Sequence, residues 1–245
     1  MRPDIDLEFL QNCGNEDLQV LCEILIKDKN GNIRFSEKLT DTDSYYNCYP
    51  HNARGMWKDI AAELQRFGGN TFLNIYRRGF GPSYESIVYD VCKKMAVKNI
   101  KEHDTAEEME QKLLCKLTEN MLDKMSDEEI AEIMKELNIK NRSYSKQGLM
   151  AALLIARSVN KQLFYKMMQY IIRFVTEMLV GRGVMWASAG ILARGTQFFL
   201  GPAGWFICGA WTLWDVAGPA YRVTIPAVLQ VSYMRMKYNS RLLTA

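Results

Sequence analysis

The stretch from Leu179 to Pro219 reads LVGRGVMWASAGILARGTQFFLGPAGWFICGAWTLWDVAGP and decides how the rest of the chain can fold. It holds eight of the sixteen glycines and four of the five tryptophans. A surface helix keeps one polar face, whereas this stretch is apolar almost all round. Each of its apolar runs must therefore be buried, either in protein or in lipid.

The uncharged run Gly195–Trp214 is 20 residues long, about the length of a helix that crosses a bilayer. The sequence Gly-Pro-Ala-Gly in its interior is expected to turn the chain. The two resulting arms are each too short to cross the ~30 Å hydrocarbon core. We therefore predict an apolar helical hairpin over residues 183–217. The residues that define it are Trp186, Gly190, Arg194, Gly201, Pro202, Gly204, Trp205, Trp211 and Trp214.

Two environments remain open for this hairpin. Its tryptophans, with Arg182, Arg194 and Arg222 around them, favour a membrane interface, where aromatic and basic residues gather. Tryptophan also fills protein cores well, so the hairpin could equally form the centre of a helical domain. A helix that spans the membrane with a fixed topology has the least support.

Charge divides the chain in the same place. Residues 146–245 hold 11 lysines and arginines against only Glu177 and Asp215, a net charge of +9, whereas the remaining residues carry −6. A basic, apolar tail suits an anionic membrane surface. The basic residues are spread singly among apolar ones, which argues against a nucleic-acid partner.

Helical periodicity dominates the chain, and the predicted class is all-α. The polar segments near residues 28–50 and 138–145 suggest three regions: a small N-terminal helical module (1–38), an acidic helical head (52–140) and a basic apolar helical region (146–245). The first helices are predicted to break at Asn12–Gly14, and Asn15 is expected to cap the second of them.

Individual helix ends can also be predicted. An apolar stripe from Met56 should end at Gly68-Gly69, and Ser83 should open the next helix. Capping boxes are predicted at 104–107 and 126–129. The last helix is expected to start near Pro226, after an extended entry, because proline fits the first turn of a helix.

Catalytic and metal-binding signatures are missing from the sequence. It contains only two histidines and no C-x-x-C pair, G-x-S-x-G, Walker or G-x-G-x-x-G motif. The six cysteines are interpreted as reduced core thiols. We expect no cofactor, no metal and no enzymatic activity.

Two charged groups are candidate sites. Glu63 and Arg66 precede the double glycine, and Arg77 and Arg78 follow it, so these four form either solvated helix-end charges or a small basic pocket that serves as an interaction surface. Arg222 is a lone charge in an apolar context. We expect it to form a structural ion pair with Asp215, because a buried arginine is seldom left unpaired.

Three motifs carry a family resemblance: DLEFLQNC at 6–13, ELQRFGG at 63–69 and AYRVTIPAVLQ at 220–230. Together they resemble the bacterial YaaW family, which is grouped with the ubiquinol–cytochrome c chaperone superfamily and often carries a short N-terminal domain like residues 3–38. The resemblance implies an α-helical protein without an established enzymatic role, distantly similar to assembly factors of membrane respiratory complexes.

The leading hypothesis is therefore a non-enzymatic, membrane-associated helical protein that acts as a chaperone or assembly factor, binds a protein partner and touches an anionic membrane surface. The chain begins without an apolar signal region, so we expect it in the cytoplasm, at the cytoplasmic face of the inner membrane. One alternative is a membrane-perturbing effector released by a signal to the N-terminal module. A second alternative is a soluble homo-oligomer that buries the hairpin between subunits.

Overall fold

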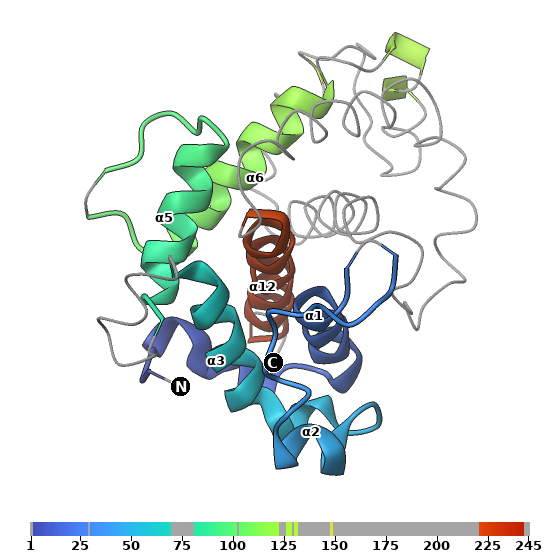
Figure 1. Ribbon diagram of the computed structural model, residues 1–245. Coiled ribbons are helices and arrows are strands. Elements are labelled where there is room, and N and C mark those ends of the chain that lie inside the picture. Colours follow the sequence, from blue (N-terminus) through green and yellow to red (C-terminus); the bar gives the residue numbers. More distant parts are fainter. Residues whose placement is uncertain are drawn as a thin grey trace.

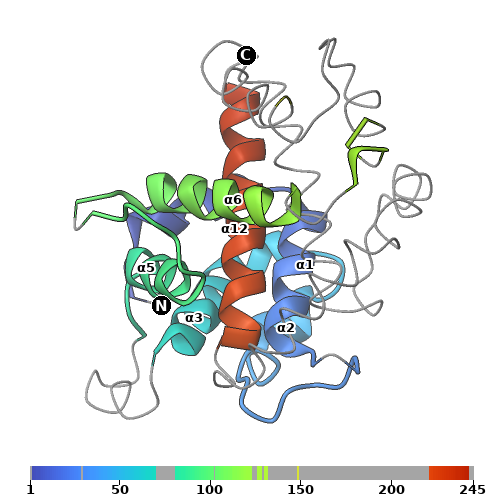
Figure 2. The same ribbon diagram turned by 90° about the horizontal axis from the view of Figure 1, so that it is seen from above.

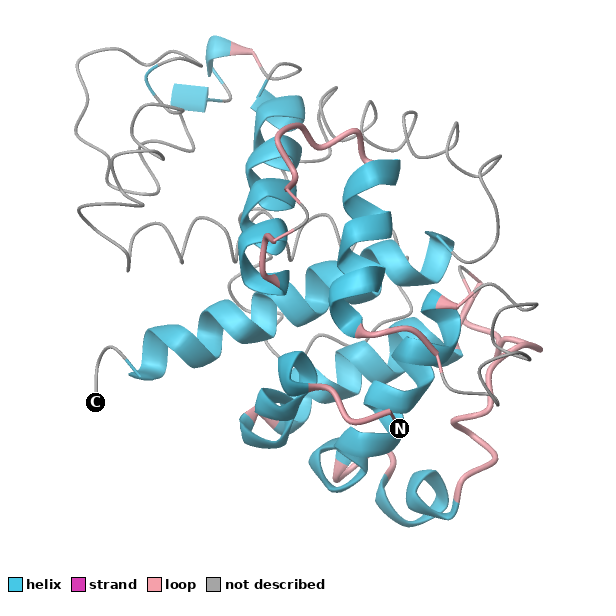
Figure 3. Cartoon of the chain, turned by 90° about the vertical axis from the view of Figure 1, so that its left-hand side faces the viewer, coloured by secondary structure: helices cyan, strands magenta, loops and turns pink. Residues whose placement is uncertain are grey.

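The computed structural model describes residues 2–28, 30–69, 81–101, 103–122, 126–128, 130–131, 148 and 221–242. Within these ranges the regular elements are helices (Figure 3), and the single β-type contact is an isolated antiparallel bridge between Lys27 and Ile33. The predicted all-α class is confirmed. The predicted hairpin over 183–217 lies outside the described residues.

The N-terminal segment forms two consecutive helices, the 3-10 helix η1 (Ile5–Asn12) and the α-helix α1 (Asn15–Ile26). The predicted break between them is confirmed. The cap is not as predicted, since Asn15 is the first helical residue and Gly14 occupies the cap position without a side-chain bond. Almost every residue of α1 is buried, which explains why its position is set by packing rather than by a cap.

The next elements surround a helix with one clear apolar stripe. The short helix α2 (Asp43–Cys48) lies within the polar segment near residues 28–50, and the Thr42 side chain caps it by accepting from the Tyr45 N–H. Helix η2 (Ala53–Met56) then leads into α3 (Trp57–Gly68), which ends at the predicted glycine pair. A Cβ on Gly68 would lie 2.3 Å from Ile87, so this glycine lets the next helix approach closely.

Helix α5 (Tyr84–Lys94) opens at Ser83, as predicted, with the serine side chain accepting from the Ser86 N–H. Helix α6 (Ala106–Leu122) begins with a capping box that is shifted by one residue from the prediction. Thr105 and Glu108 exchange the reciprocal bonds, at 3.2 and 2.9 Å. Asp104 takes no part in the box because its carboxylate binds Lys112 and the Lys101 N–H.

The last helix, α12 (Tyr221–Leu242), corrects a second prediction. It is already helical over residues 221–225, so Pro226 lies inside the helix rather than at its start. A proline there removes one backbone hydrogen bond and costs about 3 kcal/mol. Burial explains why the helix continues, since residues 223–232 are all buried. Packing of that apolar surface outweighs the local penalty.

Helix α12 passes through the middle of the described molecule (Figures 1 and 2). It has α1 on one side and α3 and α5 on the other, while α6 crosses it. One hydrophobic core includes residues from Leu7 in η1 to Met236 in α12. Residues from all three predicted regions thus share this core, and the division into regions stays a prediction.

Candidate functional site

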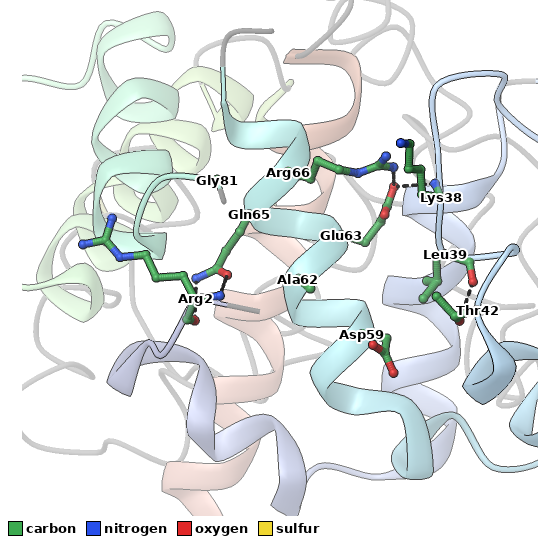
Figure 4. A pocket seen from close by; sticks show the side chains of 10 residues that line it. All are labelled: Arg2, Lys38, Leu39, Thr42, Asp59, Ala62, Glu63, Gln65, Arg66 and Gly81. Carbon is green, nitrogen blue, oxygen red and sulfur yellow. Dashed lines mark hydrogen bonds and ion pairs between the residues drawn. The ribbon is translucent and has the colours of Figure 1, made fainter. Parts of the chain in front are cut away.

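A pocket of about 200 Å³ opens between α3, residues 38–42 and the N-terminal residues (Figure 4). Two of the predicted site residues, Glu63 and Arg66, lie on its α3 wall. Gln65 lies on the same helix, whereas Arg2, Lys38 and Gly81 reach the lining from other parts of the chain. The pocket is therefore assembled by the fold and not by one local motif.

Glu63 is the buried charge of this pocket, with 4 % of its surface exposed. Its Oε1 accepts from the Lys38 N–H at 3.2 Å and from the Arg66 guanidinium one helical turn away. Burial raises the pKa of Glu63, while Arg66 opposes that shift by favouring the carboxylate. The carboxylate is thus held in place from both of its neighbouring segments.

Arg66 connects α3 to residues 36–38. Besides binding Glu63, its guanidinium donates to the Ser36 carbonyl at 3.1 Å. Lys38 is exposed and borders the same edge of the pocket (Figure 4). Glu37 also lies close to Glu63, so two cations and two carboxylates meet along this edge.

On the opposite wall of the pocket, Gln65 binds the N-terminal residues. Its amide accepts from the Arg2 N–H at 3.1 Å and donates to the buried Asp4 carboxylate at 2.9 Å. Gly81 packs against the Gln65 backbone so closely that a Cβ would lie 1.8 Å from the Gln65 carbonyl oxygen. Only glycine fits there, so the pocket wall depends on this one close approach.

The chemistry of the described residues suits binding. No group of three or more His, Cys, Asp or Glu is placed to hold a metal ion among them. Burial raises the pKa of Cys13 and Cys92 to about 12, and that of Cys22 also rises, so these thiols stay neutral and poorly nucleophilic. The pocket offers a fixed carboxylate beside the side chains of Lys38 and Arg66, which can orient a polar group of a partner.

The other predicted site residues are only partly described. Arg77 and Arg78 lie outside the described residues, and so do Asp215 and all nine of the hairpin residues. Arg222 lies exposed in the first turn of α12, so it is not the buried arginine that the sequence suggested. Its pairing with Asp215 stays a prediction. No described helix combines the length and the apolar composition needed to cross a membrane.

The arginine of α12 that protein covers most is Arg235, whose side chain is 12 % exposed. Its Nε donates to Glu110 at 2.9 Å and its terminal nitrogen to the Asp6 carbonyl at 2.8 Å. The Tyr84 hydroxyl donates to the other oxygen of Glu110 at 2.7 Å. Glu110, Arg235 and Tyr84, hereafter the core triad, thus join α6, α12 and α5 around η1.

A signal for the core triad does exist in the sequence. Glu110 lies three, four and seven residues before Leu113, Leu114 and Leu117, which places it on the buried face of α6. A charge on an apolar helical face requires a partner, although the spacing cannot say which one. In the structure that partner lies 125 positions further along the chain.

Comparison with known proteins gives consistent relatives. The ubiquinol-cytochrome C chaperone family model matches residues 52–229, and a domain of unknown function (DUF3944) matches residues 1–35. A UPF0174 protein of Helicobacter pylori is 39 % identical over 96 % of this chain and 92 % of its own length. The UPF0174 protein YaaW of Escherichia coli is 32 % identical over 95 % of this chain and 94 % of its own.

No solved structure matches the chain. The two family models cover most of the sequence, and the relatives match nearly end to end, which confirms the resemblance drawn from the three sequence motifs. The chain therefore belongs to the UPF0174 (YaaW) proteins and to the ubiquinol-cytochrome C chaperone family.

Proposed function

We propose that this chain is a chaperone-like helical protein that holds a protein partner without catalysing a reaction. The observation that carries the proposal is its membership in the ubiquinol-cytochrome C chaperone family over residues 52–229. A chaperone-like role needs a stable body and a binding surface. The shared core supplies the body, and the pocket beside Glu63 supplies an ordered polar surface for the partner.

We further propose that the protein works at the cytoplasmic face of the inner membrane, as an assembly factor for a membrane complex. The support is in the sequence: the apolar, tryptophan-rich segment 183–217 lies in a region with a net charge of +9. Aromatic residues and cations together favour the interface of an anionic membrane. Docking there would place the helical body beside newly made membrane subunits.

The membrane part is tested by fractionating the full-length protein with a carbonate wash. Removing everything after Ser145 would be uninformative, because α12 belongs to the core. The test variant instead replaces Trp186, Trp205, Trp211 and Trp214 by serine, and an unfolding curve checks that it still folds. We expect wild-type protein in the washed pellet and the variant in the supernatant. Wild-type protein that is wholly released by the wash would contradict membrane docking.

The partner-binding part is tested by reversing one charge at the pocket rim. Lys38→Glu changes the exposed cation beside Glu63, and Lys58→Glu makes the same change on exposed α3 surface away from the pocket lining. Each full-length variant is returned to a strain that lacks the protein, and assembled membrane complexes are measured by native electrophoresis. We expect Lys38→Glu to lower one complex and Lys58→Glu to restore it. Equal restoration by both variants would overturn the assignment of the pocket.

A further inference from the structure

Basic side chains gather where α5 ends and α12 begins. Residues 93–101 read KKMAVKNIK and hold four lysines and no acid. The Lys94 ammonium lies 5.4 Å from the centre of the Tyr221 ring, so the last turn of α5 meets the first turn of α12. This cluster, hereafter the basic end, consists of the exposed Lys93, Lys98 and Arg222 and the half-buried Lys94.

The backbone after α5 holds the start of its loop in place (Figure 1). The Ala96 N–H donates to the Lys93 carbonyl at 3.1 Å. The Val97 N–H donates to the Cys92 carbonyl at 3.0 Å, so the loop is closed onto the last turn of the helix. Ala96 reaches this geometry with a φ of 51°, a left-handed conformation that usually belongs to glycine. The loop therefore starts from a fixed point, one residue before Lys98.

Acids nearby do not cancel the charge of the basic end. Residues 90–104 hold four lysines and three acids, and Lys112 and Arg222 on adjoining helices raise the net charge of the neighbourhood to +3. Asp90 is half-buried, and Lys93 acts on its carboxylate, so this acid offsets one of the four cations.

Two further ion pairs beside the basic end are balanced. Lys112 binds the Asp104 carboxylate. Arg34 lies near Arg222, and Asp28 acts on Arg34 more strongly than Arg222 does. Because these pairs add no net charge, the excess of positive charge stays with the basic end.

Helix dipoles explain only part of the cluster. Lysines in the last turn of a helix offset its negative end, which accounts for Lys93 and Lys94. The first turn of a helix is its positive end and favours acids, yet the first turn of α12 contains Arg222 and no acid. A cation there is unfavourable for the helix alone, and an anion outside the protein would offset that effect.

The chain itself indicates which anion lies there. The apolar segment 183–217 ends four positions before Tyr221, and four extended residues span at most about 14 Å. If that segment docks on a membrane, Tyr221 is held within this distance of it. The opposite end of α12 is further away, because the 22 residues of this helix span about 33 Å. An acidic protein has no such tether to the basic end.

We propose that the basic end is a second membrane contact, which binds the headgroups of anionic phospholipids beside the hairpin. The inference rests on the membrane part of the proposed function and adds an electrostatic contact made by the helical body. Lysines and arginines near an anionic surface each strengthen binding, and salt weakens that contribution. The half-buried Tyr221 next to Lys94 suits the same interface.

The test measures binding of full-length proteins to vesicles of mixed phosphatidylglycerol and phosphatidylcholine. The variant Lys93→Gln/Lys98→Gln removes two exposed cations of the basic end. The matched control Arg54→Gln/Lys58→Gln removes two exposed cations near the start of α1, where the Arg54 N–H donates to Asn15. We expect about thirtyfold weaker binding for the variant and less than about threefold for the control. Unfolding curves check that both proteins fold.

Lipid charge and salt separate an electrostatic contact from a general loss of binding. On vesicles of pure phosphatidylcholine, the variant and wild type should bind equally, because the hairpin is unchanged. On the anionic vesicles, raising the salt concentration should weaken binding of the wild type more than binding of the variant. An equal loss of binding on both kinds of vesicle would overturn the proposal.

The same measurements separate this inference from the proposed function. If Lys93→Gln/Lys98→Gln binds anionic vesicles like wild type, the hairpin docks alone and the basic end is not a lipid contact. If wild-type protein binds no vesicles, the membrane part of the proposed function fails and the inference fails with it. Loss of a dimer by the variant in sedimentation without vesicles would assign the basic end to a contact between copies of the chain and overturn the proposal.

Discussion

Two buried glutamates in this protein each meet an arginine, but the two pairs serve different ends. Glu110 is 2 % exposed and binds Arg235, 125 positions away, whose side chain is 12 % exposed. Glu63 is 4 % exposed and binds Arg66 in the same helix, whose side chain is 24 % exposed. The first pair joins two helices, and the second borders an open pocket.

The difference teaches how burial alone can mislead. In the core triad, Arg235 also lies 4.5 Å from the Phe9 ring, and only 12 % of its side chain is exposed. Beside the pocket, Arg66 and Lys38 keep one edge in solvent. A buried carboxylate marks a structural junction in one case and a binding surface in the other, and the position of its cation tells them apart.

Removing the cation of the core triad should have the largest effect. Arg235→Met leaves the Glu110 carboxylate buried without its partner, and we expect a loss of about 3–5 kcal/mol in the free energy of unfolding. Arg66→Met should cost less than half as much, because Glu63 keeps the Lys38 N–H. Denaturant unfolding of both variants measures the ratio. Equal losses would remove the distinction between the two pairs.

A double variant sharpens the same comparison. Glu110→Leu/Arg235→Met replaces both charges of the pair by apolar groups but leaves the Tyr84 hydroxyl without its acceptor, so we expect it to recover part of the stability that the single variant loses. A double variant no more stable than Arg235→Met, within the error of the measurement, would mean that Arg235 stabilises the core mainly through Asp6 and Phe9.

A methyl group at Gly81 should have the next largest effect. Gly81→Ala forces the Gln65 backbone to move, and we expect a loss of about 1–3 kcal/mol together with weaker function of the pocket. Gly31→Ala is the contrast, since its φ of 82° carries strain but open space surrounds it. Thermal unfolding compares the two. A larger loss at Gly31 would show that the pocket wall yields easily.

The pH dependence of stability should report Glu63 more weakly. Its pKa is raised above the ordinary value of 4.5, so the folded state holds the proton more tightly than the unfolded state. Wild-type stability relative to Glu63→Gln should therefore be highest below pH 4.5 and fall as the pH rises through the folded-state pKa. Urea unfolding at several pH values measures this difference. A difference that rises with pH would reverse the sign and contradict the burial argument.

The smallest expected effect is at the exposed side chains of Ile33 and Phe35. Ile33→Ser/Phe35→Ser should change the free energy of unfolding by less than about 0.5 kcal/mol, because neither side chain packs in the core. Denaturant unfolding provides the number. A loss of more than about 1 kcal/mol would mean that these two side chains contribute to the stability of the fold.

Sequence patterns predicted the parts of this fold that depend on neighbours along the chain. The stripe of α3, its end at Gly68 and the cap at Ser83 follow from local spacing and were confirmed. Pro226 was assigned wrongly because the burial of α12 outweighs its local preference. The capping box starts at Thr105 and not at Asp104 because the Asp104 carboxylate binds Lys112, a contact that the local sequence does not specify.

The candidate site divides in the same way. Glu63 and Arg66 are three residues apart and could be selected from the sequence, whereas Lys38 and Gly81 reach the pocket only through tertiary packing. Arg235 was overlooked in favour of Arg222, because both sit among apolar residues and spacing alone does not show which helical face is buried. The spacing of residues in the sequence indicates which charged residues matter, but it does not show which of them pair across distant segments.

The central position of α12 has a consequence for how the protein is made. A ribosome completes residues 2–122 about 100 residues before it reaches the start of α12, which is a delay of roughly 5–20 s. During that interval the nascent α1, α3, α5 and α6 have no helix to close around, and the apolar surfaces that will contact α12 are exposed to water. A protein of a chaperone family therefore itself passes through a stage of synthesis at which apolar surface of its first helices is exposed.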